Sequence, residues 1–168
     1  MKAKNILVAM DDSEPSRRIL PSVAEKAIGS DTSNVFLCHL LPPLPPELLE
    51  SRGAEDPREE QAVERTQEIA QAKWIDERVK EGEHLVAESK KTLEKLGLPQ
   101  KRIQTRVTEP IDAHEKMADA IIELARELGC DTIAVGHQSF AALREMLRSH
   151  IADQLQRRAE GIEIWVIQ

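Results

Sequence analysis

The chain has 168 residues and a formal net charge of −7, with 32% charged and 40% hydrophobic residues. This length suits one domain with a buried core, so we predict a single domain over residues 1–168. The acidic balance disfavours binding to nucleic acid and to anionic membranes, because both need a basic face. Aromatic residues make up only 2% of the chain, which also argues against stacking platforms for bases.

The two cysteines, Cys38 and Cys130, lie far apart in sequence and form no CxxC pair. This usage is typical of a reducing compartment and not of a disulfide framework. The apolar run near the N-terminus covers only residues 6–10, which is too short for a signal peptide. No apolar stretch approaches the ~20 residues of a membrane span. We therefore expect a cytoplasmic protein.

Five apolar runs have the composition of strands, and helical segments separate them. The first helix is expected to begin at Ser13, with Asp12 as a capping group, and to kink at Pro21. For Asp11, helix capping and ligand contact are equally open. Asp112 and Glu115 form a capping pattern before a later helix. The last helix is expected at about 150–159. The predicted strands span residues 5–10, 34–41, 101–107, 131–135 and 162–167.

Residues 47–97 form a charged helical insertion in this pattern. Prolines between 42 and 46 exclude regular structure there, and a polar loop should follow up to residue 57. One helix over 58–96 would be ~60 Å long, too long for the domain, so we predict a break near 71–75 or at Gly82. The surface around Trp74 is either a partner site or a solvated face over a packed stripe, and the helical spacing favours the second.

The alternation of strands and helices predicts an α/β fold, an open, twisted, parallel five-stranded sheet with helices on both faces. Ligands of such sheets bind at the carboxyl ends of the strands, where the strand order reverses. Four residues fall at such ends: Asp11, His39, Gly136 and His137.

The segment 136–151, GHQSFAALREMLRSHI, connects the fourth strand to the last helix. A strand, a glycine turn and a helix start bring together backbone N–H groups and the positive end of a helix dipole, which favours phosphate binding. Gly136 is its only glycine, whereas a phosphate cradle needs several. The segment therefore predicts a partly dismantled phosphate site.

A receiver-type phosphoacceptor site is one alternative. Asp11 and Asp12 would hold Mg²⁺, but this chemistry also needs an aspartate after the third strand and a lysine after the fifth. The third strand is followed by Thr108 and Glu109, and the fifth by Gln168. The receiver interpretation therefore loses two essential groups.

A metal site is a second alternative, although its ligands are scattered without diagnostic spacing. It would gather His39, His137, His150, Cys38 and Asp11. Since lone histidines are more often solvated or packed, we predict no metal site. Nucleophile elbows, Walker motifs and catalytic triads are missing from the sequence, so we predict no catalytic residue.

Four segments, in this order, resemble the universal stress protein family: ILVAMDDSEPSRRIL, VFLCHLLPP, DTIAVGHQSFAALREMLRSHIADQL and EIWVI. They match its opening strand and acidic turn, its second strand, its glycine-loop segment and its last strand. The resemblance covers nearly the whole chain. It implies the strand order 3-2-1-4-5 of the adenine-nucleotide alpha-hydrolase-like fold.

The family's nucleotide-binding loop reads G-x-x-G, nine residues, then G-[S/T]. This chain keeps Gly136 but has Ser139, Ser149 and His150 at the other three positions. By matching position, Asp11 would face ribose or a metal ion. The resemblance places the remaining site residues around adenine (Leu40 and Val135) and around the phosphates (Gly136, Ser139, Ser149, His150 and Ile151).

The substituted glycines predict weak ATP binding. A side chain at 139 or 149 costs ~1–2 kcal/mol where a left-handed backbone is required, and it fills space that a phosphate would use. We therefore expect a non-catalytic stress-response homodimer that pairs through the last strand, residues 162–167, and requires no cofactor. The alternative is an ATP- or AMP-binding switch, or a slow ATPase, that uses Mg²⁺.

Overall fold

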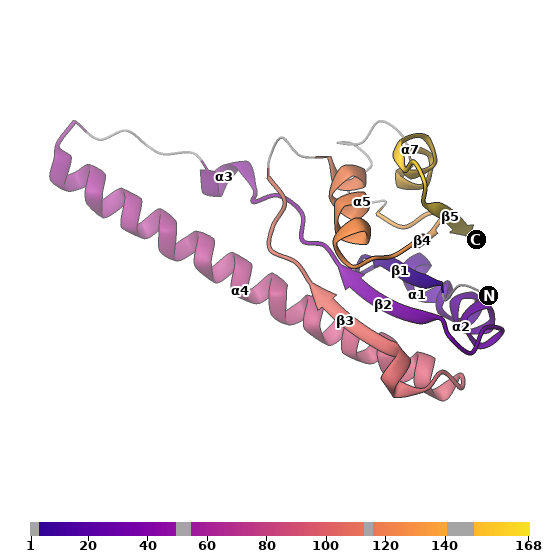
Figure 1. The fold of residues 1–168 in the computed structure, drawn as a ribbon. Coiled ribbons are helices and arrows are strands. Elements are labelled where there is room, and N and C mark those ends of the chain that lie inside the picture. Colours follow the sequence, from indigo (N-terminus) through magenta and orange to yellow (C-terminus); the bar gives the residue numbers. More distant parts are fainter. Residues whose placement is uncertain (1–3, 50–54, 113–115, 141–149) are drawn as a thin grey trace.

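The computed structural model describes residues 4–49, 55–112, 116–140 and 150–168. Its strands form one parallel sheet in the order β3-β2-β1-β4-β5 (Figure 1). The strands are β1 (Asn5–Met10), β2 (Asn34–His39), β3 (Ile103–Val107), β4 (Thr132–Gly136) and β5 (Glu163–Ile167). The helices are α1 (Glu14–Arg18), α2 (Leu20–Ile28), α3 (Pro46–Leu49), α4 (Pro57–Lys95), α5 (Met117–Glu127) and α7 (Ile151–Arg158), with a 3-10 turn η1 (Gln100–Arg102). The predicted fold class and strand order are confirmed.

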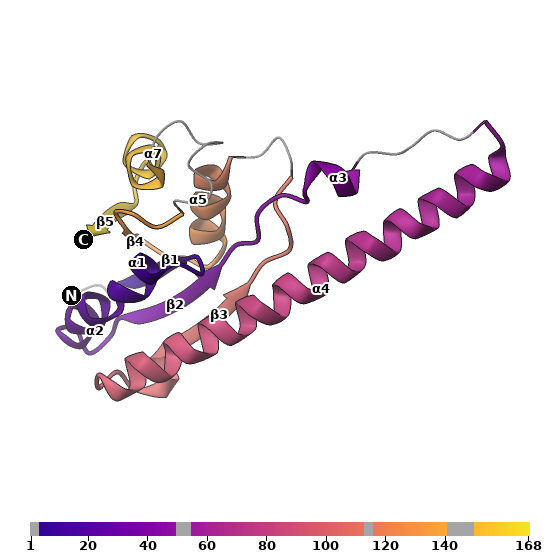
Figure 2. The same cartoon turned by 180° about the vertical axis from the view of Figure 1, so that it is seen from behind.

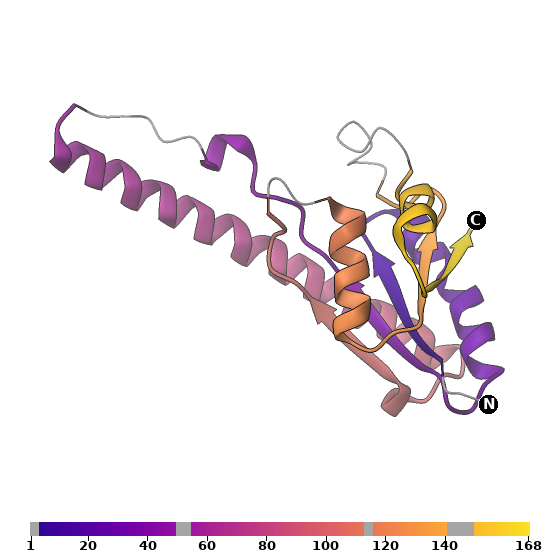
Figure 3. The same cartoon turned by 45° about the horizontal axis from the view of Figure 1, so that its top comes forward.

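Helices cover both faces of the sheet (Figures 2 and 3). Side chains of β1 alternate between two fully buried clusters, because successive residues of a strand point to opposite faces. Leu7 and Ala9 pack with α5 and α7. Ile6, Val8 and Met10 pack with Ile19 and with α2 and α4. The continuous apolar run of β1 is therefore what a central, doubly covered strand requires.

The strand order reverses between β1 and β4. The chain passes from β1 outward through β2 to β3, returns to β4 beside β1, and ends at β5. At the carboxyl ends of this central pair, Met10 leads into Asp11 and Gly136 leads into His137. This is where a doubly wound sheet offers its ligand crevice.

The first helical segment is interrupted close to the predicted kink. Ile19 ends α1 and is the N-cap of α2. Pro21 has no N–H with which to bond the carbonyl of Arg17, and the Ile19 N–H takes that acceptor instead. Ser13 caps α1 as predicted. The capping role of Asp12 was wrong, because its exposed carboxylate pairs with Arg17 Nη2 at 3.3 Å.

The predicted break in the long helix was also wrong. α4 runs through 39 residues without interruption, which makes it ~58 Å long at ~1.5 Å per residue. Its buried side chains all lie between Gly82 and Leu93, where it packs against β2 and β3. The N-terminal part continues beyond the sheet (Figures 1 and 2), so the width of the domain does not limit the helix.

Two expected boundaries near this helix also differ from the structure. Part of the polar loop forms α3, and the Leu48 carbonyl accepts hydrogen bonds from Gln67 Nε2 at 2.8 Å and Gln71 Nε2 at 2.6 Å. α5 has Lys116 as its N-cap, so Asp112 does not cap it, and Glu115 lies outside the described residues.

Long as α4 is, no helix in the described part of the chain is apolar enough to cross a membrane.

Gly82 marks a close approach and not a helix break. A Cβ at this position would lie 2.6 Å from Cδ2 of His39 and 3.0 Å from Cγ1 of Val107. These two residues end β2 and β3. The His39 ring cannot easily move away, because its Nδ1 is bonded to the Met10 carbonyl at 3.0 Å.

We predict that Gly82→Ala destabilises the protein by ~1–3 kcal/mol, although alanine normally favours a helix by ~1 kcal/mol. The reason is overlap with His39, so the same substitution in a His39→Ala background should cost less than half as much. Urea denaturation of the four proteins in this cycle measures the coupling. Equal losses in both backgrounds would contradict the packing argument.

Candidate functional site

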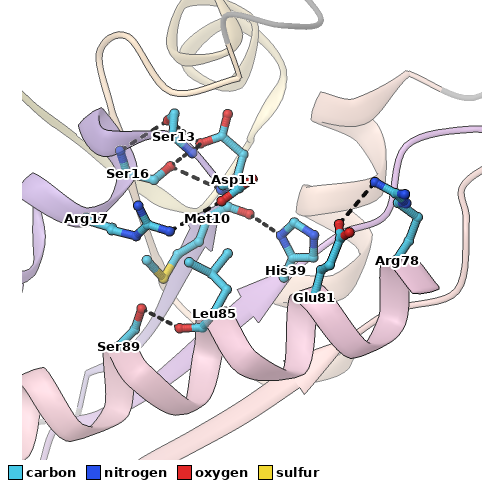
Figure 4. Close-up of polar contacts among 11 residues, drawn as sticks. Met10, Asp11, Ser13, Ser16, Arg17, His39, Arg78, Glu81, Leu85 and Ser89 are labelled. Atoms are coloured by element: carbon cyan, nitrogen blue, oxygen red, sulfur yellow. Dashed lines mark hydrogen bonds and ion pairs between the residues drawn. The ribbon is translucent and has the colours of Figure 1, made fainter. Parts of the chain in front are cut away.

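The carboxylate of Asp11 lies directly after β1 and is bonded on one oxygen by the start of α1 (Figure 4). Oδ1 accepts hydrogen bonds from the Ser13 N–H at 3.2 Å and from the hydroxyls of Ser13 and Ser16. The Asp11 N–H in turn donates to Ser16 Oγ at 3.1 Å. A carboxylate has about four acceptor positions, shared between its two oxygens, so three donors saturate Oδ1.

The other oxygen of Asp11 joins this turn to the glycine-loop segment. Oδ2 accepts the backbone N–H of Phe140 at 2.7 Å. This is a charge-assisted bond between residues 129 positions apart in sequence. It ties the carboxyl end of β1 to the loop that leaves β4.

The first amides of the loop donate to acceptors within the protein. The His137 N–H bonds the Ile167 carbonyl at 2.8 Å, and the Ser139 N–H bonds the Gly136 carbonyl at 3.1 Å. With the Phe140 N–H on Asp11, three of the donors that could cradle a phosphate are already used. A phosphate would have to break these hydrogen bonds, and breaking each one costs free energy.

Ser139 fills the inside of this loop and is 4% exposed. Its Oγ is 2.9 Å from Ser16 Oγ. Since the single hydroxyl hydrogen of Ser16 is directed to the Asp11 carboxylate, Ser139 must be the donor of this bond. A Cβ on Gly136 would overlap Ser139 Oγ and would lie 3.1 Å from the Pro15 carbonyl. Gly136 therefore makes room for the protein's own side chain.

Among the described residues of the loop, Phe140 has a left-handed backbone, with φ of 64°, and Ser139 does not. A left-handed backbone is therefore not required at Ser139, and the conditional cost predicted for a side chain there does not arise. For a bulky residue this conformation costs ~1–2 kcal/mol. The Phe140 side chain is 3% exposed in the core between the sheet and α5 and α7, and this burial offsets the strain. Ser149 lies outside the described residues.

The residues expected around adenine, and Ile151, belong to the same core cluster. Val135 and Ile151 are 0% and 1% exposed, so a ligand would reach their side chains only by displacing neighbours. Leu40 is 3% exposed and borders a hollow of about 480 Å³ between the end of β3 and α5. Of the expected site residues, the structure thus brings Asp11, Gly136 and Ser139 into one hydrogen-bonded group.

The histidines do not assemble the scattered metal site. His39 turns toward α4, and its Nδ1 donates to the Met10 carbonyl (Figure 4). His137 and His150 do meet, with ring centroids 4.9 Å apart in a stacked arrangement. Among the residues that the structure describes, no three histidine, cysteine or acidic side chains gather to hold a metal ion.

Both cysteines are buried and free. Burial raises the pKa of the Cys38 thiol to about 12, with a smaller contribution from Cys130 and an opposing one from Arg106. Burial and the nearby Asp131 carboxylate raise the pKa of Cys130 to about 12. Since the thiolate is the metal ligand and the nucleophile, neither cysteine is suited to those roles at neutral pH.

The observed topology also excludes the receiver alternative. Receiver domains have the strand order 2-1-3-4-5, whereas β3 lies at the edge of this sheet beside β2. Thr108 follows β3 and donates its N–H to the His39 carbonyl at 3.0 Å. The phosphoacceptor position is therefore neither chemically nor spatially present.

Comparison with known families identifies the chain. Residues 2–161 match the universal stress protein family. The chain belongs to this family. No sequence among functionally curated proteins matches it.

Solved universal stress proteins share the fold at low sequence identity. A family member from Burkholderia pseudomallei has 16% identity and a TM-score of 0.65, with 98% of this chain and 95% of that chain covered. A universal stress protein in complex with cAMP has 16% identity and a TM-score of 0.59, covering 100% and 98%. The Archaeoglobus fulgidus protein in complex with dAMP has 18% identity and a TM-score of 0.54, covering 100% of both chains.

Sequence reasoning missed two members of the hydrogen-bonded group, Ser16 and Phe140. Ser16 carried a signal, because a serine on the inner side of a helix needs a partner when it is buried. Phe140 contributes through its backbone N–H, and the residue type at a position does not reveal which acceptor its N–H bonds.

The raised thiol pKa values predict a loss of stability at high pH. An unfolded thiol loses its proton near its ordinary pKa of 9.0, whereas the folded thiols keep theirs until about 12. Between these values the unfolded state binds fewer protons, so stability falls as pH rises, by up to ~1.4 kcal/mol per pH unit and thiol. Urea denaturation at about pH 8 and about pH 10 should show a smaller fall in a Cys38→Ala/Cys130→Ala variant. An equal fall in stability in the two proteins would contradict the assignment of this loss to the thiols.

Proposed function

We infer that this universal stress protein is a non-catalytic, cytoplasmic stress-response regulator that acts as a homodimer and has a degenerate nucleotide site. The observation that carries the proposal is the internal bonding of the loop. The amides of His137, Ser139 and Phe140 are bonded to protein acceptors. The buried Ser139 side chain occupies the space above Gly136. The free, buried thiols of Cys38 and Cys130 are consistent with a reducing compartment.

The proposal predicts no micromolar binding of ATP or AMP to the purified protein with Mg²⁺ present. Binding would break charge-assisted and buried hydrogen bonds, and each of these losses weakens affinity about tenfold or more. Isothermal titration calorimetry measures it, and absorbance at the adenine band checks for nucleotide carried through purification. Saturable micromolar binding of either nucleotide would refute the degenerate site.

The second candidate is an ATP- or AMP-binding switch or slow ATPase that uses Mg²⁺. Structures of two relatives are described as complexes with cAMP and dAMP. Oδ2 of Asp11 accepts one bond among the described residues, which leaves capacity for a ribose hydroxyl. In this candidate Asp11 holds ribose or metal, so Asp11→Ala abolishes nucleotide binding. Unchanged affinity would eliminate it.

The homodimer would form through β5, the last strand of the chain, which lies at one edge of the sheet beside β4. Ile164, Trp165, Val166 and Ile167 are all only half-buried in the single chain. The Glu163 N–H and the Ile167 carbonyl point to β4. Since backbone direction alternates along a strand, the N–H groups of Ile164 and Val166 face the free edge. An open apolar edge of this kind favours pairing with a second copy.

We therefore predict that Val166→Pro converts a dimer to a monomer without unfolding it. Proline removes the outward N–H but leaves the bonds to β4 intact. Light scattering coupled to chromatography gives the mass, and circular dichroism checks the fold. Val166→Ala is the matched control and should remain dimeric. A Val166→Pro protein that stays dimeric would place the interface elsewhere.

A further inference from the structure

We propose that Asp11 acts as an internal anion that blocks the glycine-loop, so that an external phosphate group competes with this carboxylate for the Phe140 N–H. The inference rests on the proposed degenerate site and names the residue that keeps it closed. It reverses the role expected for Asp11, because a blocking residue weakens nucleotide binding and a ligand-contacting residue strengthens it.

The geometry of the contact supports this role. Asp11 Oδ2 lies 2.7 Å from the Phe140 nitrogen, a short distance for a charge-assisted bond. The carboxylate is thus placed where an anion would bond the same amide. A phosphate oxygen on this amide would meet both the lost bond and the like charge of Asp11, and the partly buried surroundings weaken screening by solvent.

The hydroxyl groups around Asp11 hold it in the blocking position. Ser13 and Ser16 fix Oδ1, and Ser139 donates to Ser16 from the loop side. The carboxylate therefore bridges both sides of the switch point through two routes, one by Oδ2 and one by the serine chain. Because both routes hold the same carboxylate, we expect the Phe140 bond and the serine bonds to break together.

Asp12 provides a matched control. It is the next residue and carries the same charge, but its side chain is 90% exposed and pairs with Arg17. Among the described contacts, none joins Asp12 to the loop. Asp12→Asn therefore removes one negative charge near the site without touching the Phe140 contact. Any effect of net charge alone should be equal in the two positions.

The first measurement is amide hydrogen exchange at Phe140, with the β4 amides as an internal reference for global stability. In Asp11→Ala the Phe140 amide should exchange about tenfold faster or more relative to β4, because its acceptor is gone. Asp11→Asn keeps the shape and should give a smaller change in the same direction. Asp12→Asn should leave the exchange as in the wild type. Equal relative exchange in Asp11→Ala and wild type would overturn the inference.

The second measurement is calorimetric titration of the same proteins with ATP and Mg²⁺. Asp11→Ala should bind about tenfold more tightly than the wild type, and Asp12→Asn should match the wild type. A gain in Asp12→Asn equal to that in Asp11→Ala would overturn the inference, as would no gain in Asp11→Ala.

The outcomes separate this inference from the proposed function. Weak wild-type binding with no gain in Asp11→Ala leaves the degenerate site standing and overturns the blocking role. Micromolar wild-type binding that becomes tighter still in Asp11→Ala does the opposite. Micromolar binding that Asp11→Ala abolishes overturns both, because Asp11 is then a ligand contact.

Discussion

The carboxylate of Asp11 connects three parts of the chain at the switch point. It ends β1, it bonds the first turn of α1 through Ser13 and Ser16, and it holds the loop after β4 through the Phe140 N–H. Without this contact the left-handed residue Phe140 would lose the bond that fixes its backbone. The position of Phe140 at the switch point therefore depends on this one side chain.

The central strands could be predicted from the sequence because burial on both faces determines them. β1 and β4 lie in the centre, are covered on both faces, and therefore appear as unbroken apolar runs. The length of α4 could not be predicted in the same way. Helical periodicity reports which face packs, but it does not report whether the packed surface ends before the helix does. Gly82 was ambiguous for a related reason, since only tertiary structure separates a break from a close contact.

The candidate site could be located from the sequence, but its internal bonding could not. Strand ends were enough to predict that Asp11 and Gly136 would lie near one another, and the family resemblance added Ser139. Which acceptor satisfies which donor depends on side-chain orientation, and here a serine turned inward toward Ser16. In this protein the substitution of glycine by Ser139 therefore adds a hydroxyl to the protein's own network, in addition to the volume that it fills.

The projecting part of α4 has a hydrodynamic consequence. A helix that extends well past its domain increases frictional drag much more than it increases mass, so the molecule should diffuse and tumble more slowly than a sphere of equal weight (Figure 1). Elution volume from a sizing column then exaggerates the apparent weight, and a single chain could be mistaken for a pair.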